Sequence, residues 1–276
     1  MELSRRKNIV FCILAIILAC IILFPVYWMF QMSFKTDNEI FQKVLTYYPH
    51  ELTTTPWMRN IANGTFFESL KNSFLNAFTT MIIALVLGVP AAYGIGRYRM
   101  NGTKVFVLVF LVTQMLPASV MLTPLYLTFG NIGLLNSHFA APVAVAAGSI
   151  PFIVVTLRPY FKSVPASLDD AARIDGCNMF QSFFYIMIPA IKTSIVTVMV
   201  ISFLHGWNDL IYSMTFNVAD EMRPLTANIR KFQTMYGTEW NSIMAYGAIL
   251  VLPVLILFVS MQKYIVGGLT AGAVKE

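Results

Sequence analysis

Residues Pro165–Pro189 read PASLDDAARIDGCNMFQSFFYIMIP and form the longest reasonably polar stretch between two apolar runs in the second half of the chain. Ser167 followed by Asp170 fits a capping box, which predicts that a helix begins here. Asp175-Gly176 then predicts a sharp elbow, because glycine adopts backbone angles that other residues resist. We therefore expect a short helix, an elbow, and a second helix that leads back into an apolar run.

The second helix of this stretch has an apolar pattern of its own. Its large apolar residues recur at i, i+3, i+4, i+7 and i+8, which predicts one apolar helix face. They are Phe180, Phe183, Phe184, Met187 and Ile188. A short helix on a rigid elbow has the geometry of a docking knob for a groove on a partner. A loop helix that lies on the lipid surface fits the same pattern, so the residues alone leave both interpretations open.

Composition identifies the class of protein. The 276 residues are 57% hydrophobic and only 12% charged, whereas soluble domains are nearer half apolar and a quarter charged. The low charge leaves long uncharged runs, which are typical of a polytopic membrane protein. The net charge of +6 arises from loops that we assign to the cytoplasm, so we expect no nucleic-acid partner.

We predict an all-α protein with six transmembrane helices in a single permease domain, residues 1–276. The expected spans are about 9–32, 72–96, 105–128, 138–160, 191–216 and 240–264, with a cytoplasmic coupling loop at 163–190 and a cytoplasmic tail at 265–276. Both termini are expected inside, because twelve of the 19 Lys and Arg fall in segments assigned to the cytoplasm. The first run ends in the aromatic sequence FPVYWMF, which favours a retained span over a cleaved signal peptide.

Several of the expected spans contain helix breakers. Gly88 and Pro90 interrupt the second span, and prolines interrupt the third and fourth. Broken spans commonly surround a cavity, whereas a packing kink with no role in transport explains Gly88 equally well.

The sequence contains little that points to catalysis. It has no G-x-x-x-x-G-K-[ST] phosphate loop, no Ser/His/Asp arrangement and no metal-ligand cluster, so we expect neither an enzyme nor a nucleotide site. Cys12, Cys20 and Cys177 lack the spacing of metal ligands, and we interpret them as small packing residues.

One acidic residue, Asp209, falls inside an expected span. Ionisable groups within a membrane are candidates for function, so Asn208 and Asp209 are possible translocation-path residues. Asp209 is expected near the outer surface, between Trp207 and Tyr212, where an anchor at the interface is at least as good an interpretation.

The stretch DDAARIDGCNMFQSFFYIMIP resembles the EAA loop of ABC importer permeases, which begins Glu-Ala-Ala and continues through Asp-Gly to a proline. The residues on that pattern are Asp170, Ala171, Ala172, Asp175, Gly176 and Pro189, with Asp170 in place of the usual glutamate. TFFESLKNSF, GWNDLIYSM and QKYIVGGLTAGAVKE are similar to the carbohydrate-uptake, binding-protein-dependent (MalG-like) branch of these permeases.

The resemblance implies a type I ABC importer permease fold in a bacterial or archaeal cell membrane. The implied partners are a second homologous (MalF-like) permease, two cytoplasmic ABC ATPases and an extracytoplasmic solute-binding protein. ATP and Mg would bind to the ATPases, with no cofactor on this chain. The implied solute is a sugar, an oligosaccharide or a polyol derivative. In the maltose relatives the partner permease holds most of the sugar, so this chain is expected to have no major solute site.

The resemblance also implies roles for particular residues. ATPase closure would push the short helix and drive alternating access. The coupling residues would be Leu168, Asp170, Ala171, Ala172, Asp175, Gly176 and Phe180. The C-terminal tail would reach the ATPases through Gly268, Thr270 and Gly272.

Two other functions are compatible with a polytopic membrane chain. An ATP-independent secondary transporter or channel, working as its own oligomer, would need charged or polar relay residues deep in the spans, which are scarce here. A non-transporting membrane scaffold is the other rival.

Overall fold

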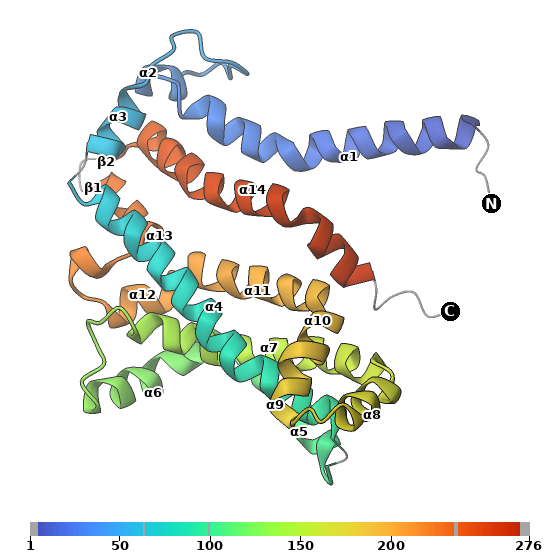
Figure 1. Cartoon of the computed structure of the whole chain (residues 1–276). Helices are drawn as coiled ribbons and strands as arrows, with labels where there is room; N and C mark the ends of the chain where they lie inside the picture. Colours follow the sequence, from blue (N-terminus) through green and yellow to red (C-terminus); the bar gives the residue numbers. More distant parts are fainter. Residues whose placement is uncertain (1–4, 63, 99, 235–236, 271–276) are drawn as a thin grey trace. The chain divides into compact units, whose positions relative to one another are not determined.

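The computed structural model of the chain describes residues 5–62, 64–98, 100–234 and 237–270, and Figure 1 shows its helices in chain order. The chain folds into two compact units. One comprises Met1–Phe66 and Ile229–Pro253, and the other comprises Phe67–Asn228 and Val254–Glu276. The expectation of a single domain stays a prediction.

The helices agree with the expectation of six spans. Four helices in the described part of the chain are long and apolar enough to cross a membrane: Ile9–Met32, Phe66–Arg97, Ala140–Ser163 and Trp240–Tyr264. Two bent pairs bring the number to six if each pair is one span. They are Thr103–Thr113 with Ala118–Asn131, bent by 97°, and Met179–Ala190 with Lys192–Trp207, bent by 85°.

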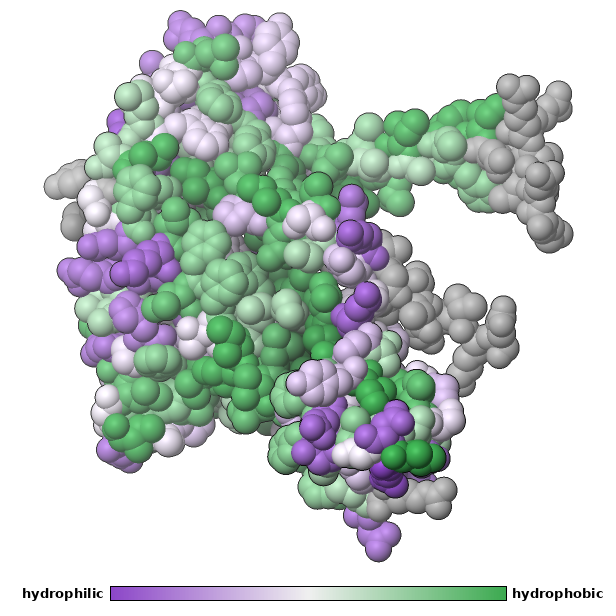
Figure 2. All heavy atoms as spheres, viewed as in Figure 1, coloured by the Kyte–Doolittle hydropathy of each residue, from purple (hydrophilic) through white to green (hydrophobic). Residues whose placement is uncertain are grey.

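The first unit contains the N-terminal helix and the start of the C-terminal one. Its elements are α1 (Arg5–Met32), α2 (Asp37–Ile40), α3 (Thr55–Ala62), η3 (Ile229–Phe232), β1 (Gln233–Thr234), β2 (Gly237–Thr238) and the first part of α14 (Trp240–Thr270). The two short strands pair antiparallel, with Gln233 opposite Thr238. The apolar window of α1 buries none of its residues, and Figure 2 shows its apolar side chains in green. Burial within this chain therefore does not explain the hydrophobicity of α1, which suits contact with lipid or a partner.

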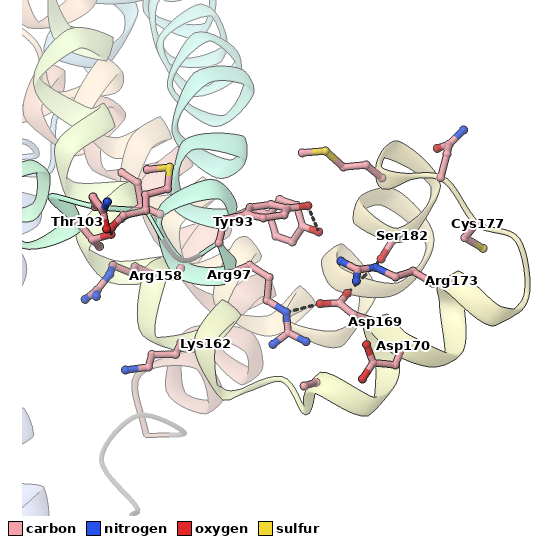
Figure 3. Close-up of a pocket in the computed structure, with 18 of the residues that line it drawn as sticks. Tyr93, Arg97, Thr103, Arg158, Lys162, Asp169, Asp170, Arg173, Cys177 and Ser182 are labelled. Atoms are coloured by element: carbon pink, nitrogen blue, oxygen red, sulfur yellow. Dashed lines mark hydrogen bonds and ion pairs between the residues drawn. The ribbon is translucent and has the colours of Figure 1, made fainter.

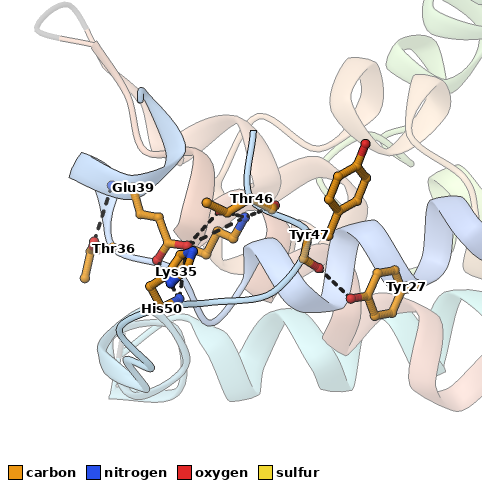
Figure 4. Close-up of polar contacts among 7 residues, drawn as sticks. All are labelled: Tyr27, Lys35, Thr36, Glu39, Thr46, Tyr47 and His50. Carbon is orange, nitrogen blue, oxygen red and sulfur yellow. Dashed lines mark hydrogen bonds and ion pairs between the residues drawn. The ribbon is translucent and has the colours of Figure 1, made fainter. Parts of the chain in front are cut away.

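A buried ion pair fixes the loop after α1. The Nζ atom of Lys35 lies 3.9 Å from a carboxylate oxygen of Glu39 and donates to the carbonyl and hydroxyl oxygens of Thr46, both at 2.6 Å (Figure 4). Glu39 accepts hydrogen bonds from the Thr46 hydroxyl and from the backbone N–H of His50. Burial opposes ionisation of Glu39. These hydrogen bonds and the Lys35 charge outweigh it and lower the pKa of the carboxyl below its usual 4.5.

The lowered pKa of Glu39 predicts a pH-dependent contribution to stability. A carboxyl whose pKa is lower in the folded state stabilises the fold above its unfolded pKa. That contribution is lost as the pH falls through the folded pKa. Glu39→Gln is therefore expected to lower the melting temperature at neutral pH, and the difference from wild type should shrink below pH 4.5. Thermal unfolding in detergent measures this, with Glu51→Gln as a control on an exposed carboxylate of the same loop. A difference that is independent of pH would contradict the prediction.

The second unit holds the remaining helices. They are α4 (Phe66–Arg97), α5 (Thr103–Thr113), α6 (Ala118–Asn131), α7 (Ala140–Ser163), α8 (Ala166–Ile174), α9 (Met179–Ser182), the π-helical turn η1 (Phe183–Met187), α10 (Ile188–Ala190), α11 (Lys192–Trp207), α12 (Ile211–Phe216), η2 (Asp220–Met222), α13 (Leu225–Asn228) and the end of α14. A polar face of α4 hydrogen-bonds the segment after α11. For example, Asn76 donates to the hydroxyl of Ser213 at 3.0 Å.

Glycines allow close helix packing in this unit. A Cβ on Gly88 of α4 would lie 2.9 Å from a side-chain carbon of Ile153 on α7, which favours packing over a cavity role for Gly88. A Cβ on Gly206 of α11 would lie 2.8 Å from the Cα of Ala77 and from the carbonyl oxygen of Asn76, both on α4. Small residues at such contacts let membrane helices approach closely.

Gly206→Ala is expected to destabilise the second unit, because backbone atoms of α4 cannot move aside for a new methyl group. We expect a loss of about 1–3 kcal/mol, seen as a fall of several degrees in the melting temperature in detergent. Gly94→Ala is the matched control, because nothing lies within 4 Å of the added Cβ on this other helical glycine. Equal melting of the two variants would contradict this packing argument.

The segment expected as the fifth span, about 191–216, contains a helix break. The helix α11 ends at Trp207, three residues leave the helix, and α12 begins at Ile211. The side chain of Asp209 contacts the start of α12, which follows it in the chain. It accepts hydrogen bonds from the N–H of Ser213 at 2.8 Å and from the Ser213 hydroxyl at 2.6 Å. A carboxylate that satisfies the N–H groups of a new helix favours this break.

Candidate functional site

The coupling loop begins with a proline. Pro165 is the N-cap of α8 in an extended conformation, and the helix starts directly at Ala166. The predicted capping box at Ser167 is wrong, because Ser167 already lies inside the first turn and no side chain caps this end. The fixed φ of proline starts the helix earlier than the serine signal indicated.

The other end of α8 has the predicted elbow. Gly176 has φ +80°, the left-handed region that favours glycine. Its N–H donates to the carbonyl of Arg173 at 3.1 Å, and the N–H of Cys177 donates to that of Ala172 at 2.9 Å. These two bonds form a complete Schellman motif, which fixes the direction in which the chain leaves the helix.

Three faces of α8 differ in exposure. Ala172 is only 2% exposed, whereas Leu168 is 42% exposed and Ile174 is 86% exposed. Asp170 and Ala171 are also exposed, so both lie on the accessible side of this helix. Figure 2 shows polar and apolar side chains mixed over α8 and α9 at the lower right. The helix therefore presents a small protruding surface with an apolar tip.

The second half of the loop departs from the predicted single apolar face. Asn178 and Gln181 form a capping box that starts α9, and a π-helical turn follows at Phe183–Met187. Phe183 and Met187 are buried, with exposed fractions of 8% and 0%, but Phe180 is 72% exposed. The π turn changes the angular spacing of the residues, so the 3.6-residue pattern does not hold through it.

An arginine outside the loop holds α8 in place. Arg97, at the end of α4, donates from Nε to the carboxylate of Asp169 (Figure 3). Its Nη1 donates to the carbonyl oxygen of Val164 at 2.7 Å. Its Nη2 reaches the carbonyl of Pro165 at 3.2 Å, and Asp169 also accepts from Ser182 at 3.2 Å. We call Arg97, Asp169 and Ser182 the clamp. It joins α4, the start of α8 and α9.

Sequence reasoning missed the clamp. From the sequence, Arg97 is one of the positive charges expected in an inner loop, and Asp169 is one of two acidic residues early in the expected helix. The acidic pair Asp169-Asp170 gave a weak signal that one of the two has a partner. The structure assigns the partner to Asp169, since Asp170 is exposed.

An aromatic cluster supports the loop from below. Tyr93 on α4 packs against Phe161 on α7 and against Phe183, with ring centroids 5.4 and 5.0 Å apart. A cavity of about 950 Å³ lies between the α4–α5 turn and α8–α9, and both Asp170 and Arg173 line it. The loop is thus fixed to α4 and α7 but remains open on its outer side.

The two expected path residues lie elsewhere in this unit. Asn208 and Asp209 both line a cleft of about 330 Å³, together with Ser149, His205 and Tyr212. Asp209 is buried and caps α12, whereas Asn208 is exposed. The expected tail residues give no further test. Gly268 and Thr270 belong to the backbone of α14 but their side chains are not described, and Gly272 lies outside the described residues.

Comparison with known proteins decides the family. Residues 84–270 match the family described as "Binding-protein-dependent transport system inner membrane component". The chain belongs to this family. The match includes the whole coupling loop and confirms the resemblance to ABC importer permeases that the loop indicated.

Similar proteins support the same assignment over nearly the full length. The permease is 30% identical to the diacetylchitobiose uptake system permease protein DasC of Streptomyces coelicolor, with 95% of each chain covered. It is 29% identical to the sn-glycerol-3-phosphate transport system permease protein UgpE of Yersinia pestis, with 96% and 97% covered. These relatives are permease subunits, so this chain is the membrane component of an ABC transporter and not a catalytic subunit.

A solved structure confirms the fold. The permease superimposes with a TM-score of 0.80 on a chain of a bacterial ABC transporter involved in the import of the acidic polysaccharide alginate, covering 96% of this chain and 99% of that one. At 24% identity this likeness shows the fold, which is that of an ABC importer permease.

Proposed function

We propose that this permease is one half of the membrane pore of an ATP-driven, binding-protein-dependent importer. In this proposal a second homologous (MalF-like) permease forms the other half, and two ABC ATPases that carry ATP and Mg bind on the cytoplasmic side. An extracytoplasmic solute-binding protein delivers the solute. Both termini then lie in the cytoplasm of a bacterial or archaeal cell.

The observation that carries the proposal is the protruding helix α8. Two of its apolar side chains, Leu168 and Ile174, are exposed, while the clamp and the Schellman elbow fix the two ends of the helix. An exposed apolar helix of this kind fits a groove on another protein. A force on α8 would pass to α4 through the hydrogen bonds of Arg97, and to α7 along the chain itself, because only Val164 and Pro165 separate the two helices.

Coupling then follows from the connection between ATPase and membrane helices. Closure of the ATPases on ATP would push α8, tilt α4 and α7 and open the pore outward, and hydrolysis would reset it. Such a change needs two discrete packings of the same helices. The bent pair α5–α6 and the break between α11 and α12 are places where these spans are not single straight helices.

The relatives suggest the class of solute. Their names refer to diacetylchitobiose, sn-glycerol-3-phosphate and, in Agrobacterium fabrum, sulfoquinovosyl glycerol, the last for a permease 29% identical with 92% of this chain covered. All three compounds are sugar or polyol derivatives. We therefore propose a sugar, an oligosaccharide or a polyol derivative as the solute.

Reconstitution tests the proposal. The permease should co-purify in mild detergent with a second permease and an ABC ATPase. Sealed vesicles that contain this complex and the cognate binding protein should take up solute only when ATP is inside. A self-sufficient oligomer of this chain that moves solute without ATP would refute the proposal and support a secondary transporter or channel.

A further inference from the structure

The cleft beside Asn208 lies next to two helix interruptions, the α5–α6 bend and the break between α11 and α12. Its walls come from the α5–α6 bend at Leu116 and Ala118, from the middle of α7, and from the end of α11. Figure 1 shows α7 and α11 running alongside each other, with α12 and α6 near the far ends of both. In transporters, binding sites commonly form at such interrupted helices, because their freed backbone groups need a polar or water-filled surrounding.

Two polar side chains at the cleft are exposed. His205 lies in the last turn of α11, and Asn208 is the first residue after this helix; both residues are exposed, although one face of the imidazole meets Ser149 and Phe152 of α7. Placing an imidazole nitrogen or an amide against acyl chains without a hydrogen-bond partner would cost several kcal/mol of free energy. Polar groups of membrane helices therefore usually face water or another polar surface.

Hydrogen bonding at Ser149 favours the tautomer of His205 in which Nε2 is the hydrogen-bond acceptor. The hydroxyl of Ser149 on α7 donates to the carbonyl of Val145 at 3.0 Å and lies 2.9 Å from Nδ1 of His205. When the single hydroxyl proton of Ser149 goes to the carbonyl of Val145, its oxygen is left as an acceptor, and Nδ1 of His205 then carries the N–H of the 2.9 Å contact. A neutral imidazole has a single N–H. Nε2 therefore keeps its lone pair, and within the described residues no group donates to it.

We propose that His205 and Asn208 form a solute subsite in this permease, in which Nε2 of His205 accepts a hydrogen bond from a hydroxyl group of the sugar or polyol in transit. This inference rests on the proposed function and adds a contact on this chain, where the resemblance implied that the partner permease holds the solute. Asp209 fixes the backbone next to Asn208, because its carboxylate accepts hydrogen bonds from the N–H and the hydroxyl of Ser213 at the start of α12.

Thiol labelling tests whether the subsite lies on an aqueous path. In a background with Cys12, Cys20 and Cys177 changed to serine, the His205→Cys variant of the complete transporter is treated with methanethiosulfonate ethyltrimethylammonium, a membrane-impermeant cation. We expect the variant to react. The matched Ser202→Cys variant should not react, because Ser202 is fully buried on the same helix.

Other labelling results would overturn the proposal. Reaction of the His205→Cys variant with the smaller, uncharged N-ethylmaleimide alone would mean that the position reaches water but is closed to a bulky cation, which is not an open solute path. Failure to react with either reagent, with or without ATP and binding protein, would mean that the position faces lipid or is covered by a partner subunit, and either result overturns the proposal.

Transport measurements test the hydrogen bond itself. His205→Phe keeps the ring shape but has no acceptor, and we expect roughly a fivefold to tenfold fall in solute carried per ATP hydrolysed. His205→Gln keeps an acceptor and should retain most of the coupling, and Ser202→Ala serves as the control. Equal ratios in wild type and His205→Phe would overturn the subsite. Wild-type vesicles without ATP-driven uptake would instead refute the proposed function, a separate result.

Discussion

Gly176→Val is expected to abolish ATP-driven uptake in reconstituted vesicles while the permease still inserts and assembles. The cause is the backbone alone, because nothing lies within 4 Å of a Cβ at this position and Gly176 has φ +80°. A β-branched residue is a strong outlier there, at a cost of about 1–3 kcal/mol. The chain would relieve that cost by opening the Schellman motif, and α8 would then lose its fixed direction.

A series at this one position separates backbone strain from side-chain bulk. Asparagine adopts left-handed angles more readily than alanine, and alanine more readily than valine. We therefore expect uptake to rank Gly176→Asn above Gly176→Ala above Gly176→Val. Size-exclusion chromatography and co-purification of the ATPase check that each complex is intact. Normal uptake by the valine variant would refute the role of the elbow in coupling.

The elbow could be predicted from the sequence because its signal is local. An Asp-Gly pair that follows two alanines marks a helix end by chemistry within a few residues. The apolar spans could be predicted for a similar reason, since a run of about twenty uncharged residues is required to cross a bilayer. The EAA resemblance added the family, which the family match confirms.

Local signals failed where two of them competed. Ser167 is a good N-cap residue, but Pro165 starts the helix two residues earlier and leaves Ser167 within the first turn. The apolar spacing of Phe180, Phe183 and Met187 assumed 3.6 residues per turn, and the π turn changes that number. A π turn has no sequence signature that distinguishes it from an ordinary helix.

Contacts between distant residues could not be predicted at all. Arg97 and Asp169 are 72 residues apart, and Ser149 and His205 are 56 apart. A single sequence shows which residues are able to pair, but only the packing of α4 against α7 and of α7 against α11 decides which do. Both candidate sites therefore depend on partners that lie on neighbouring helices.

Arg97→Met is expected to uncouple the transporter, lowering the solute carried per ATP at least tenfold. The side chains of Arg97 and Asp169 are only 12% and 14% exposed. Removing one partner of a mostly buried pair leaves the other unpaired, which costs about 3–5 kcal/mol. Methionine keeps most of the aliphatic length of arginine but donates to none of the three acceptors on Val164, Pro165 and Asp169.

Lys162→Met is the matched control for Arg97→Met. Lys162 lines the same cavity with an exposed side chain, but no ion pair or hydrogen bond to it is found within the described residues. It should keep normal coupling. A loss of coupling in both variants would mean that the positive charge of this surface matters, and the clamp would not be the cause.

A double variant separates the stability of the clamp from its role in transmission. In Arg97→Met with Asp169→Leu, no buried charge remains unpaired, and apolar replacement of a buried pair is often neutral for stability. The melting temperature should therefore recover toward wild type. Uptake should stay low, because the carbonyls of Val164 and Pro165 still lack the donor that ties α8 to α4. If uptake recovers together with melting, the clamp only stabilises the loop, and the push on α8 must reach the membrane helices by another route.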